Sequence, residues 1–187
     1  MFYADYSDDG SRVLYVDDTG LGKNFTYLLH LNDKKTGDDK ILLSKRETIF
    51  NPVLSHDMTA IAFFERQSAG DSSLSVIWRY NIEDEVLQEV TSCPSKKAGN
   101  SELSWSAGDS CLGLFHAPSQ QPNGFIFALS QPDDIHILSG EQFCWVGDDR
   151  IIYSRGEGGI YLYDMRDRKE SNLNPEGTNP VYLYKGK

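Results

Sequence analysis

The sequence predicts an all-β fold, and three features of the chain support this prediction. Short runs rich in aromatic and β-branched residues alternate with clusters of Gly, Pro, Asn, Asp and Ser, which is the pattern of strands joined by turns. No segment keeps a helical period over the roughly 11 residues that would favour a helix. The same order of runs also recurs along the chain. The clearest predicted strands cover residues 12–16, 25–29, 60–64, 75–78, 112–115, 125–129, 151–153 and 160–163.

Each repeat follows the same plan of four predicted strands. A first apolar strand ends in a turn, a second strand follows at once, and a polar loop, a third strand and a shorter fourth strand complete the repeat. The turns begin at Ser7, Ser55, Ser106 and Gly147, and this spacing is the period of the repeat. The fourth strands are predicted at residues 40–43, 86–90 and 135–138, with a weaker candidate at 170–173.

A repeat of roughly 40–50 residues with four strands is the signature of a β-propeller blade. A four-stranded sheet has two apolar faces, and packing blades face to face buries both. A β-sandwich also uses many short strands, but it does not predict a repeated turn motif. We therefore expect an all-β chain folded as a β-propeller of about four four-stranded blades. The predicted single domain covers residues 1–187, with blades at about 1–46, 47–94, 95–140 and 141–177.

The last residues leave two possibilities for the closure of the ring. Residues 179–182 (Asn-Pro-Val-Tyr) echo residues 51–54 (Asn-Pro-Val-Leu), which predicts a final strand at 178–187. That strand either closes the ring against the first blade or begins a fifth unit. In the second case the chain is an incomplete or fragmentary propeller, and its uncovered apolar faces would favour self-association or a second chain.

The repeated turn motif resembles one found in a known family. An apolar strand, then Ser-x-Asp-Gly, then a strand of the type x-Ile-Ala-Phe is similar to the TolB-like repeat, a relative of the WD-type propellers. Residues 6–15 (YSDDGSRVLY) are the nearest copy and residues 50–63 (FNPVLSHDMTAIAF) the second. The later copies depart from the pattern, since Gly108-Asp109 lacks the Asp-Gly order and Gly147 replaces the Ser. The resemblance implies a propeller fold, in a family that usually has more than four blades.

Composition limits the classes of partner. The chain has 187 residues, 28 Asp and Glu against 18 Lys and Arg, and a formal net charge of −10. Nucleic acids and anionic membranes need a basic surface, so neither is expected as the main partner. No apolar run approaches the roughly 20 residues of a membrane span. Three widely spaced cysteines, Cys93, Cys111 and Cys144, favour a reducing compartment such as the cytoplasm, and the bacterial periplasm stays open if a leader has been removed.

Acidic residues are concentrated in two classes of predicted turn. In a propeller, the turns between the first and second strands and between the third and fourth strands lie on one face. We predict a partner-binding surface there, where the acidic side chains steer a basic protein. Calcium binding at paired aspartates and the general preference of turns for Asp are the alternatives. The predicted partner-binding residues are Asp8, Asp9, Asp33, Asp38, Asp39, Glu83, Asp84, Glu85, Asp133 and Asp134.

Catalytic motifs are weak in this sequence. Ser55-His56-Asp57 contains the residue types of a triad, but adjacent residues in a turn cannot adopt the geometry of one. The four histidines are scattered without metal-ligand spacing, and no G-x-S-x-G motif is present. Residues 156–159 (Gly-Glu-Gly-Gly) link two predicted strands and therefore indicate a hairpin turn, not a phosphate-binding loop.

These observations favour a non-enzymatic protein-binding module that presents a rigid acidic loop surface. An inhibitor or immunity-type protein is one specific form of this hypothesis, with no cofactor and no metal. The alternative is the propeller domain of a hydrolase, either the gating domain of a peptidase or part of a carbohydrate-active enzyme, without a catalytic set of its own.

Overall fold

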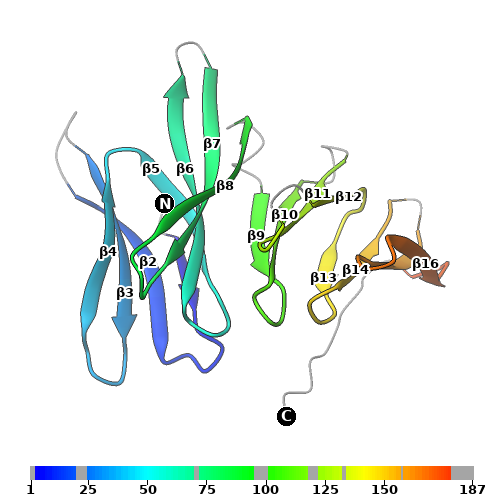
Figure 1. The fold of residues 1–187 in the computed structure, drawn as a ribbon, viewed down its shortest axis with the longest axis horizontal. Helices are drawn as coiled ribbons and strands as arrows, with labels where there is room; N and C mark the ends of the chain where they lie inside the picture. The colour runs from blue at the N-terminus through cyan, green and yellow to red at the C-terminus, as the bar shows by residue number, and fades with distance from the viewer. Residues whose placement is uncertain are drawn as a thin grey trace. The chain divides into compact units, whose positions relative to one another are not determined.

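The computed structural model describes residues 3–19, 25–69, 72–94, 101–117, 122–131, 134–156 and 158–177. These residues form sixteen strands and no helix (Figure 1). The strands make four antiparallel sheets of four, each in chain order. Accordingly, the described part of the chain contains no helix that could cross a membrane.

The first two sheets come from the first half of the chain. Sheet 1 contains β1 (Ala4–Tyr6), β2 (Arg12–Thr19), β3 (Thr26–Asp33) and β4 (Asp39–Lys45). Sheet 2 contains β5 (Thr48–Leu54), β6 (Ala60–Ala69), β7 (Ser72–Asn81) and β8 (Leu87–Pro94).

The other two sheets have shorter strands. Sheet 3 contains β9 (Ser101–Trp105), β10 (Cys111–His116), β11 (Gly124–Ala128) and β12 (Ile135–Leu138). Sheet 4 contains β13 (Phe143–Trp145), β14 (Arg150–Ser154), β15 (Ile160–Asp164) and β16 (Lys169–Asn174). The weak fourth strand predicted at 170–173 is therefore present as β16, whereas the final strand predicted at 178–187 lies outside the described residues.

The repeat seen in the sequence is also a repeat of backbone hydrogen bonds. The first turn of each sheet is closed by an amide that donates to a carbonyl across the hairpin: Ser7 to Arg12, Ser55 to Ala60, Ser106 to Cys111 and Val146 to Arg150. Val146, not Gly147, therefore occupies the serine position in the fourth repeat. That hairpin is one residue shorter than the others, which the alignment on Gly147 did not anticipate.

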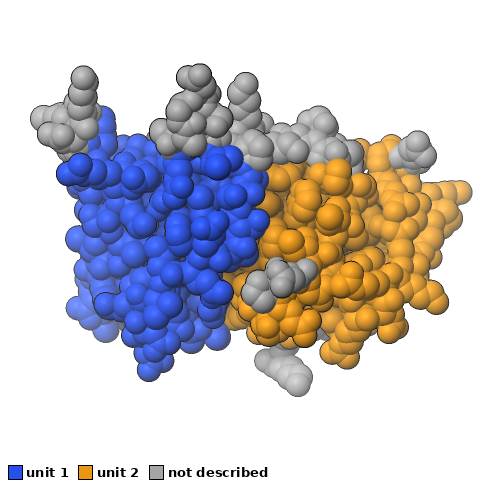
Figure 2. All heavy atoms as spheres, turned by 45° about the horizontal axis from the view of Figure 1, so that its top comes forward, with its two compact units in different colours: residues 1–103 blue, residues 104–187 orange. Residues whose placement is uncertain are grey.

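The chain divides into two compact units, residues 1–103 and residues 104–187 (Figure 2). In the first unit, Leu14 and Leu29 of sheet 1 pack with Ile61 and Phe63 of sheet 2, and all four are fully buried. In the second unit, sheets 3 and 4 share a core. That core includes Cys111, Phe115, Ile126, Leu138, Ile151, Tyr153 and Met165. In both units the apolar residues of one sheet thus pack against those of the next sheet along the chain.

Candidate functional site

The first and third turns of every sheet lie at the same end of that sheet. In an antiparallel sheet with strands in chain order, this follows from the alternating strand direction. One backbone hydrogen bond joins the two turns each time. The pairs are Lys34 to Ser11 (2.8 Å), Ile82 to Thr59 (2.8 Å), Leu129 to Ser110 (3.0 Å) and Met165 to Asp149 (2.8 Å), with the amide donor named first. The acidic residues of the two turn classes are therefore brought together within each sheet.

In the first unit, the acidic ends of sheets 1 and 2 are also linked to each other. Lys40 at the start of β4 forms an ion pair with Glu85 in the β7–β8 turn, with 3.3 Å between Nζ and Oε1. We call this region the acidic end of the first unit. It contains eight of the predicted residues, which are Asp8, Asp9, Asp33, Asp38, Asp39, Glu83, Asp84 and Glu85.

In the second unit, Asp134 lies at the corresponding end, before β12. It accepts a hydrogen bond from Arg168 in the β15–β16 turn and lies 3.5 Å from Nε2 of His136. Two basic side chains of the same turn are thus paired with carboxylates, because Arg166 also contacts Asp149 at 2.5 Å. Asp133, also predicted, lies outside the described residues. A larger part of the negative charge at this end is therefore neutralised by basic side chains than at the acidic end of the first unit.

Several of these carboxylates hold their own turn together. Oδ1 of Asp9 accepts hydrogen bonds from the hydroxyl of Ser7 (2.8 Å) and the amide of Ser11 (2.9 Å). Hydrogen bonding from the side chain and the backbone of Ser11, and then from the side chain of Ser7, lowers the pKa of the Asp9 carboxyl. Asp33 accepts from the amides of Lys35 and Thr36, which lower the pKa of its carboxyl. These geometries are Asx turns, in which an aspartate replaces a missing backbone acceptor. Asp9 and Asp33 therefore have a structural role whatever else they do.

Asp39 belongs to a small cluster at the edge of the sheet. Its Oδ2 accepts a hydrogen bond from the hydroxyl of Tyr15 (2.9 Å) and lies 3.0 Å from Nδ1 of His30, and the Tyr15 and His30 rings are stacked. Burial, together with the adjacent carboxylate, raises the pKa of Tyr15 to about 12. The tyrosine hydroxyl therefore stays protonated and Asp39 stays its acceptor at neutral pH.

Four carboxylates of the acidic end remain available to a partner. Asp8, Asp38, Glu83 and Asp84 are all exposed, and no Lys or Arg among the described residues lies within ion-pair distance of them. Since their charges are not compensated locally, they make the end of the first unit a negative surface. Among the eight predicted residues of this end, these four are the ones without a basic partner in the described part of the chain.

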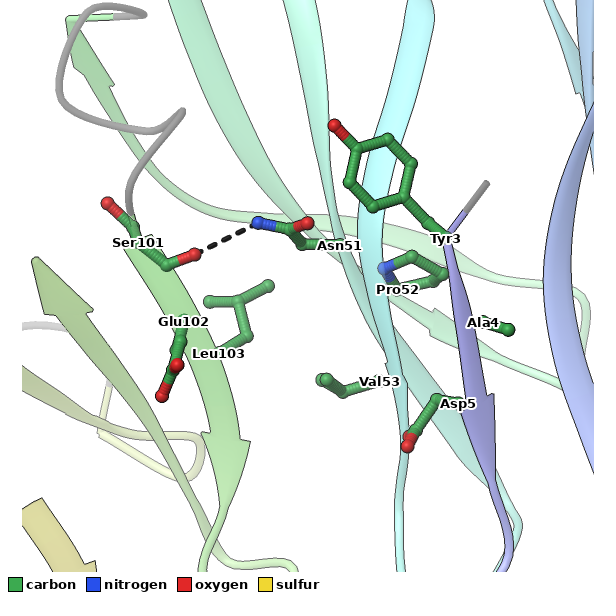
Figure 3. Close-up of a pocket in the computed structure, with 9 residues that line it drawn as sticks. All are labelled: Tyr3, Ala4, Asp5, Asn51, Pro52, Val53, Ser101, Glu102 and Leu103. Carbon is green, nitrogen blue, oxygen red and sulfur yellow. Dashed lines mark hydrogen bonds between the residues drawn. The ribbon is translucent and has the colours of Figure 1, made fainter. Parts of the chain in front are cut away.

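A second feature of the first unit is an open groove of about 530 Å³ (Figure 3). Its walls are the first strands of successive repeats: β5 and β9 contribute three residues each, and β1 contributes two, with Tyr3 directly before it. The lining residues are Tyr3, Ala4, Asp5, Asn51, Pro52, Val53, Ser101, Glu102 and Leu103.

Two hydrogen bonds link the strands that line the groove. The side-chain amide of Asn51 donates to the carbonyl of Ser101 (2.9 Å), and Oδ2 of Asp5 accepts from the backbone amide of Leu54 (2.8 Å). Asn51 has a φ of 48°, and the β5–β6 register shifts between Phe50 and Val53, so the strand carries a bulge here. A bulge at a sheet edge redirects a side chain, and here it directs the Asn51 amide toward Ser101.

The groove was not predicted from the sequence. Its residues come from three successive repeats and are therefore far apart along the chain, and none belongs to the acidic turns. The one available signal was Pro52 in the Asn-Pro-Val segment at residues 51–53, because Pro within a sheet is confined to edge strands, strand starts and bulges.

The residues of the weak catalytic motif act inside a turn. The hydroxyl of Ser55 donates to Asp57 (2.7 Å) and accepts from the amide of Ala60 (2.9 Å). This arrangement is the same as that of Ser7, Asp9 and Arg12 in the first repeat. Within the described ranges, no group of three or more His, Cys, Asp or Glu side chains is placed to hold a metal ion.

Comparison with known proteins identifies the fold. Neither the protein-family models nor the curated proteins contain a match to the sequence. Among solved structures, the β-propeller domain of the Trilobed protease from Pyrococcus furiosus, described as having an open velcro topology, has a TM-score of 0.67 and 16% identity over 94% of this chain and 58% of that chain.

Two further solved structures have a similar fold. TolB from Acinetobacter baumannii has a TM-score of 0.56 and 12% identity, over 94% of this chain and 44% of that one. Acylaminoacyl peptidase from Pyrococcus horikoshii has a TM-score of 0.64 and 14% identity, over 94% of this chain and 33% of that one. The chain thus spans about half the length of the first structures it matches, or less. At these identities the likeness shows the fold alone: the four sheets are β-propeller blades, similar to those of TolB and of peptidase propeller domains.

Proposed function

We propose that this chain is a non-enzymatic protein-binding module whose acidic end receives a basic protein. The observation that carries the proposal is the group of exposed, uncompensated carboxylates Asp8, Asp38, Glu83 and Asp84 on turns that Asx hydrogen bonds hold rigid. A rigid negative surface attracts a basic partner before contact and raises the rate of association more than the affinity. An inhibitor or immunity-type protein is the specific form that we favour.

The test is a pull-down in which the chain is the bait, at low and at high salt. We expect a basic partner to be retained at low salt and lost at high salt, because salt screens charges that are exposed. The double variant Glu83→Gln and Asp84→Asn should retain much less of it. The matched control Asp18→Asn and Glu47→Gln changes the net charge equally at the other end of sheet 1 and should behave as the wild type. Retention that is indifferent to salt, or equal loss in both variants, would contradict the proposal.

A second candidate is the propeller domain of a hydrolase. It is favoured by the likeness to propeller domains of peptidases, among them acylaminoacyl peptidase and prolyl endopeptidases. Asp5 and Glu102, which line the groove, are the carboxylates from which a carbohydrate-active site could be built. A screen of peptide and glycosidic substrates tests for such a site. Turnover that is lost in Asp5→Asn or Glu102→Gln would favour an enzyme with its site in the groove, whereas no turnover is expected both of the binding module and of a propeller domain without a catalytic set.

A further inference from the structure

Every blade has two faces, and the internal repeat shows which residues belong to which. At the junction of sheets 1 and 2, Leu14, Leu29 and Leu42 of sheet 1 meet Leu54, Ile61 and Phe63 of sheet 2. In every sheet, we call the side that carries the residues at the positions of Leu14, Leu29 and Leu42 the forward face. The opposite side, which carries the residues at the positions of Leu54, Ile61 and Phe63, is the rear face. The six exposed fractions lie between 0% and 9%, so this junction excludes water.

The same rule holds at the junction in the second unit. The turn hydrogen bonds and the strand registers place Ile126 of sheet 3 at the position of Leu31 in sheet 1, on the forward face. They place Ile151 and Tyr153 of sheet 4 at the positions of Ile61 and Phe63 in sheet 2, on the rear face. Ile126, Ile151 and Tyr153 share one core. Both units therefore pack a forward face against the rear face of the next sheet.

The forward face of sheet 4 has apolar residues at the same positions as that of sheet 1, but they are more exposed. Ile152 and Ile160 correspond to Leu14 and Leu29, and both are partly exposed where the sheet 1 residues are fully buried. Leu173 is the extra residue of the β15–β16 bulge, as Leu42 is of the β3–β4 bulge. Leu42 is 9% exposed and Leu173 is 53% exposed.

The rear face of sheet 1 is the complementary case. Tyr6, Val13 and Tyr15 stand at the positions of Leu54, Ile61 and Phe63 in sheet 2. Tyr6 is 57% exposed where Leu54 is 7% exposed, and Val13 and Tyr15 are partly exposed where Ile61 and Phe63 are fully buried.

The hydrogen-bonded pair of Tyr15 and Asp39 on this rear face has a counterpart elsewhere in the chain whose tyrosine is buried. The hydrogen bond from Tyr15 to Asp39 has a counterpart in sheet 4, where Tyr153 donates to Glu170. Tyr153 nevertheless lies in the core shared with sheet 3 and is 1% exposed. A rear face with a paired tyrosine hydroxyl is therefore one that a forward face can cover.

We infer that the forward face of sheet 4 docks on the rear face of sheet 1 in a second copy of this chain. Both halves of such a junction are present on one chain, and each is built at the positions that form the junctions inside the units. One chain spans 58% of the Trilobed protease propeller, so a second copy would supply the further blades that a propeller of at least that length contains. The contact is heterologous, and heterologous contacts build either closed rings or open filaments. The form that we infer is the closed ring of two chains. The inference rests on the fold and not on the acidic end.

The oligomeric state of the purified chain tests the inference. Light scattering should give a mass twice the 21.1 kDa of a single chain. Leu173→Lys on the forward face and Tyr6→Lys on the rear face should each halve that mass. The matched control Val86→Lys replaces an apolar residue of similar exposure, 56%, in the β7–β8 turn and should leave it unchanged.

Mixing the two interface variants makes the test specific. Each variant alone lacks one half of every junction, but a mixture pairs the intact sheet 4 of Tyr6→Lys with the intact sheet 1 of Leu173→Lys. The mass measured for the mixture should therefore return toward that of the dimer. Two misfolded variants would not form a dimer when mixed.

Salt separates this inference from the proposed function. Higher salt should favour the dimer, since two chains of net charge −10 repel each other, whereas it weakens the binding of a basic partner. A wild-type chain that stays monomeric at every concentration and salt would overturn the inference.

Discussion

Aspartates of the same turns have different roles in this protein. Asp33 and Asp164 occupy the same position in sheets 1 and 4, and each accepts two backbone amides of its turn. Asn81 takes this role in sheet 2, where it accepts from the amides of Glu83 and Asp84. A neutral amide serves as well as a carboxylate here, because the backbone needs an acceptor and not a charge. The proposed function rests instead on the exposed acids beside them.

His136 allows a prediction at the scale of a single residue. It is 4% exposed, with Nδ1 3.0 Å from the Tyr163 hydroxyl and Nε2 3.5 Å from Asp134. Burial, assisted by the charge of Arg168, lowers its pKa below the usual 6.5, although Asp134 opposes this. A histidine with a lowered pKa stabilises the fold fully above pH 6.5, and this contribution is lost as the pH falls toward the lowered value.

We therefore expect the free energy of unfolding to decrease as the pH is lowered from about 6.5. The variant His136→Gln, which can still bond Tyr163 but does not titrate, should lose less stability over the same range. Chemical denaturation at a series of pH values measures the difference. Parallel curves for the two proteins would show that His136 does not cause the dependence.

The third hairpin shows how one structural element compensates for the sequence of another. Ser7 and Ser55 donate to an aspartate of their own turn, Asp9 and Asp57. In the third repeat Gly108 stands at that position, and Asp148 of the β13–β14 turn supplies the carboxylate instead. Its Oδ1 accepts from the hydroxyl of Ser106 (3.0 Å) and the amide of Gly108 (2.5 Å). The deviation from the repeat motif is thus a link between two sheets of the second unit.

Two substitutions that together move the carboxylate from position 148 to position 108 test this link. A side chain at Gly108 would overlap the Asp148 carboxylate, so Gly108→Asp should destabilise the second unit by about 1–3 kcal/mol. Asp148→Gly removes two hydrogen bonds and should cost about 1–2 kcal/mol. The double variant restores the motif of the first two repeats and should be more stable than the sum of the single changes predicts. Additive effects, measured by a double-mutant cycle, would refute the compensation.

Net charge acts on the whole molecule. With a net charge of −10 and uncompensated carboxylates gathered at the acidic end, like charges oppose folding at low ionic strength. We expect moderate salt to raise the melting temperature by about 2–4 °C, the shift that about 1 kcal/mol produces in a chain of this size. Glu83→Lys with Asp84→Lys should reduce this rise. A melting temperature that falls with added salt would show that attractive pairs, such as Lys45–Glu65 at 3.0 Å, outweigh the repulsion.

The strands and turns were predictable from the sequence because short-range chemistry determines them. Alternating apolar residues and turn residues within a short stretch fix a hairpin, and the Ser-x-Asp turn closes through bonds between near neighbours. The fourth strand at Lys169–Asn174 was the weakest prediction, since its residues are all exposed and give little hydrophobic pattern. The likeness to TolB-like blades came from the same local motif, repeated.

Contacts between residues that are far apart along the chain could not be predicted from the sequence. Asp148 replaces the missing aspartate of the third hairpin from 40 positions away, and Asn51 reaches Ser101 from 50 positions away. The groove and the distinction between compensated and uncompensated acids also depend on such contacts. Sequence determined the blades, because each is stabilised by its own hydrogen bonds and turns. Only the tertiary structure decided which side chains meet between blades, because apolar burial holds the sheets together without direction and leaves the individual polar contacts to the packing.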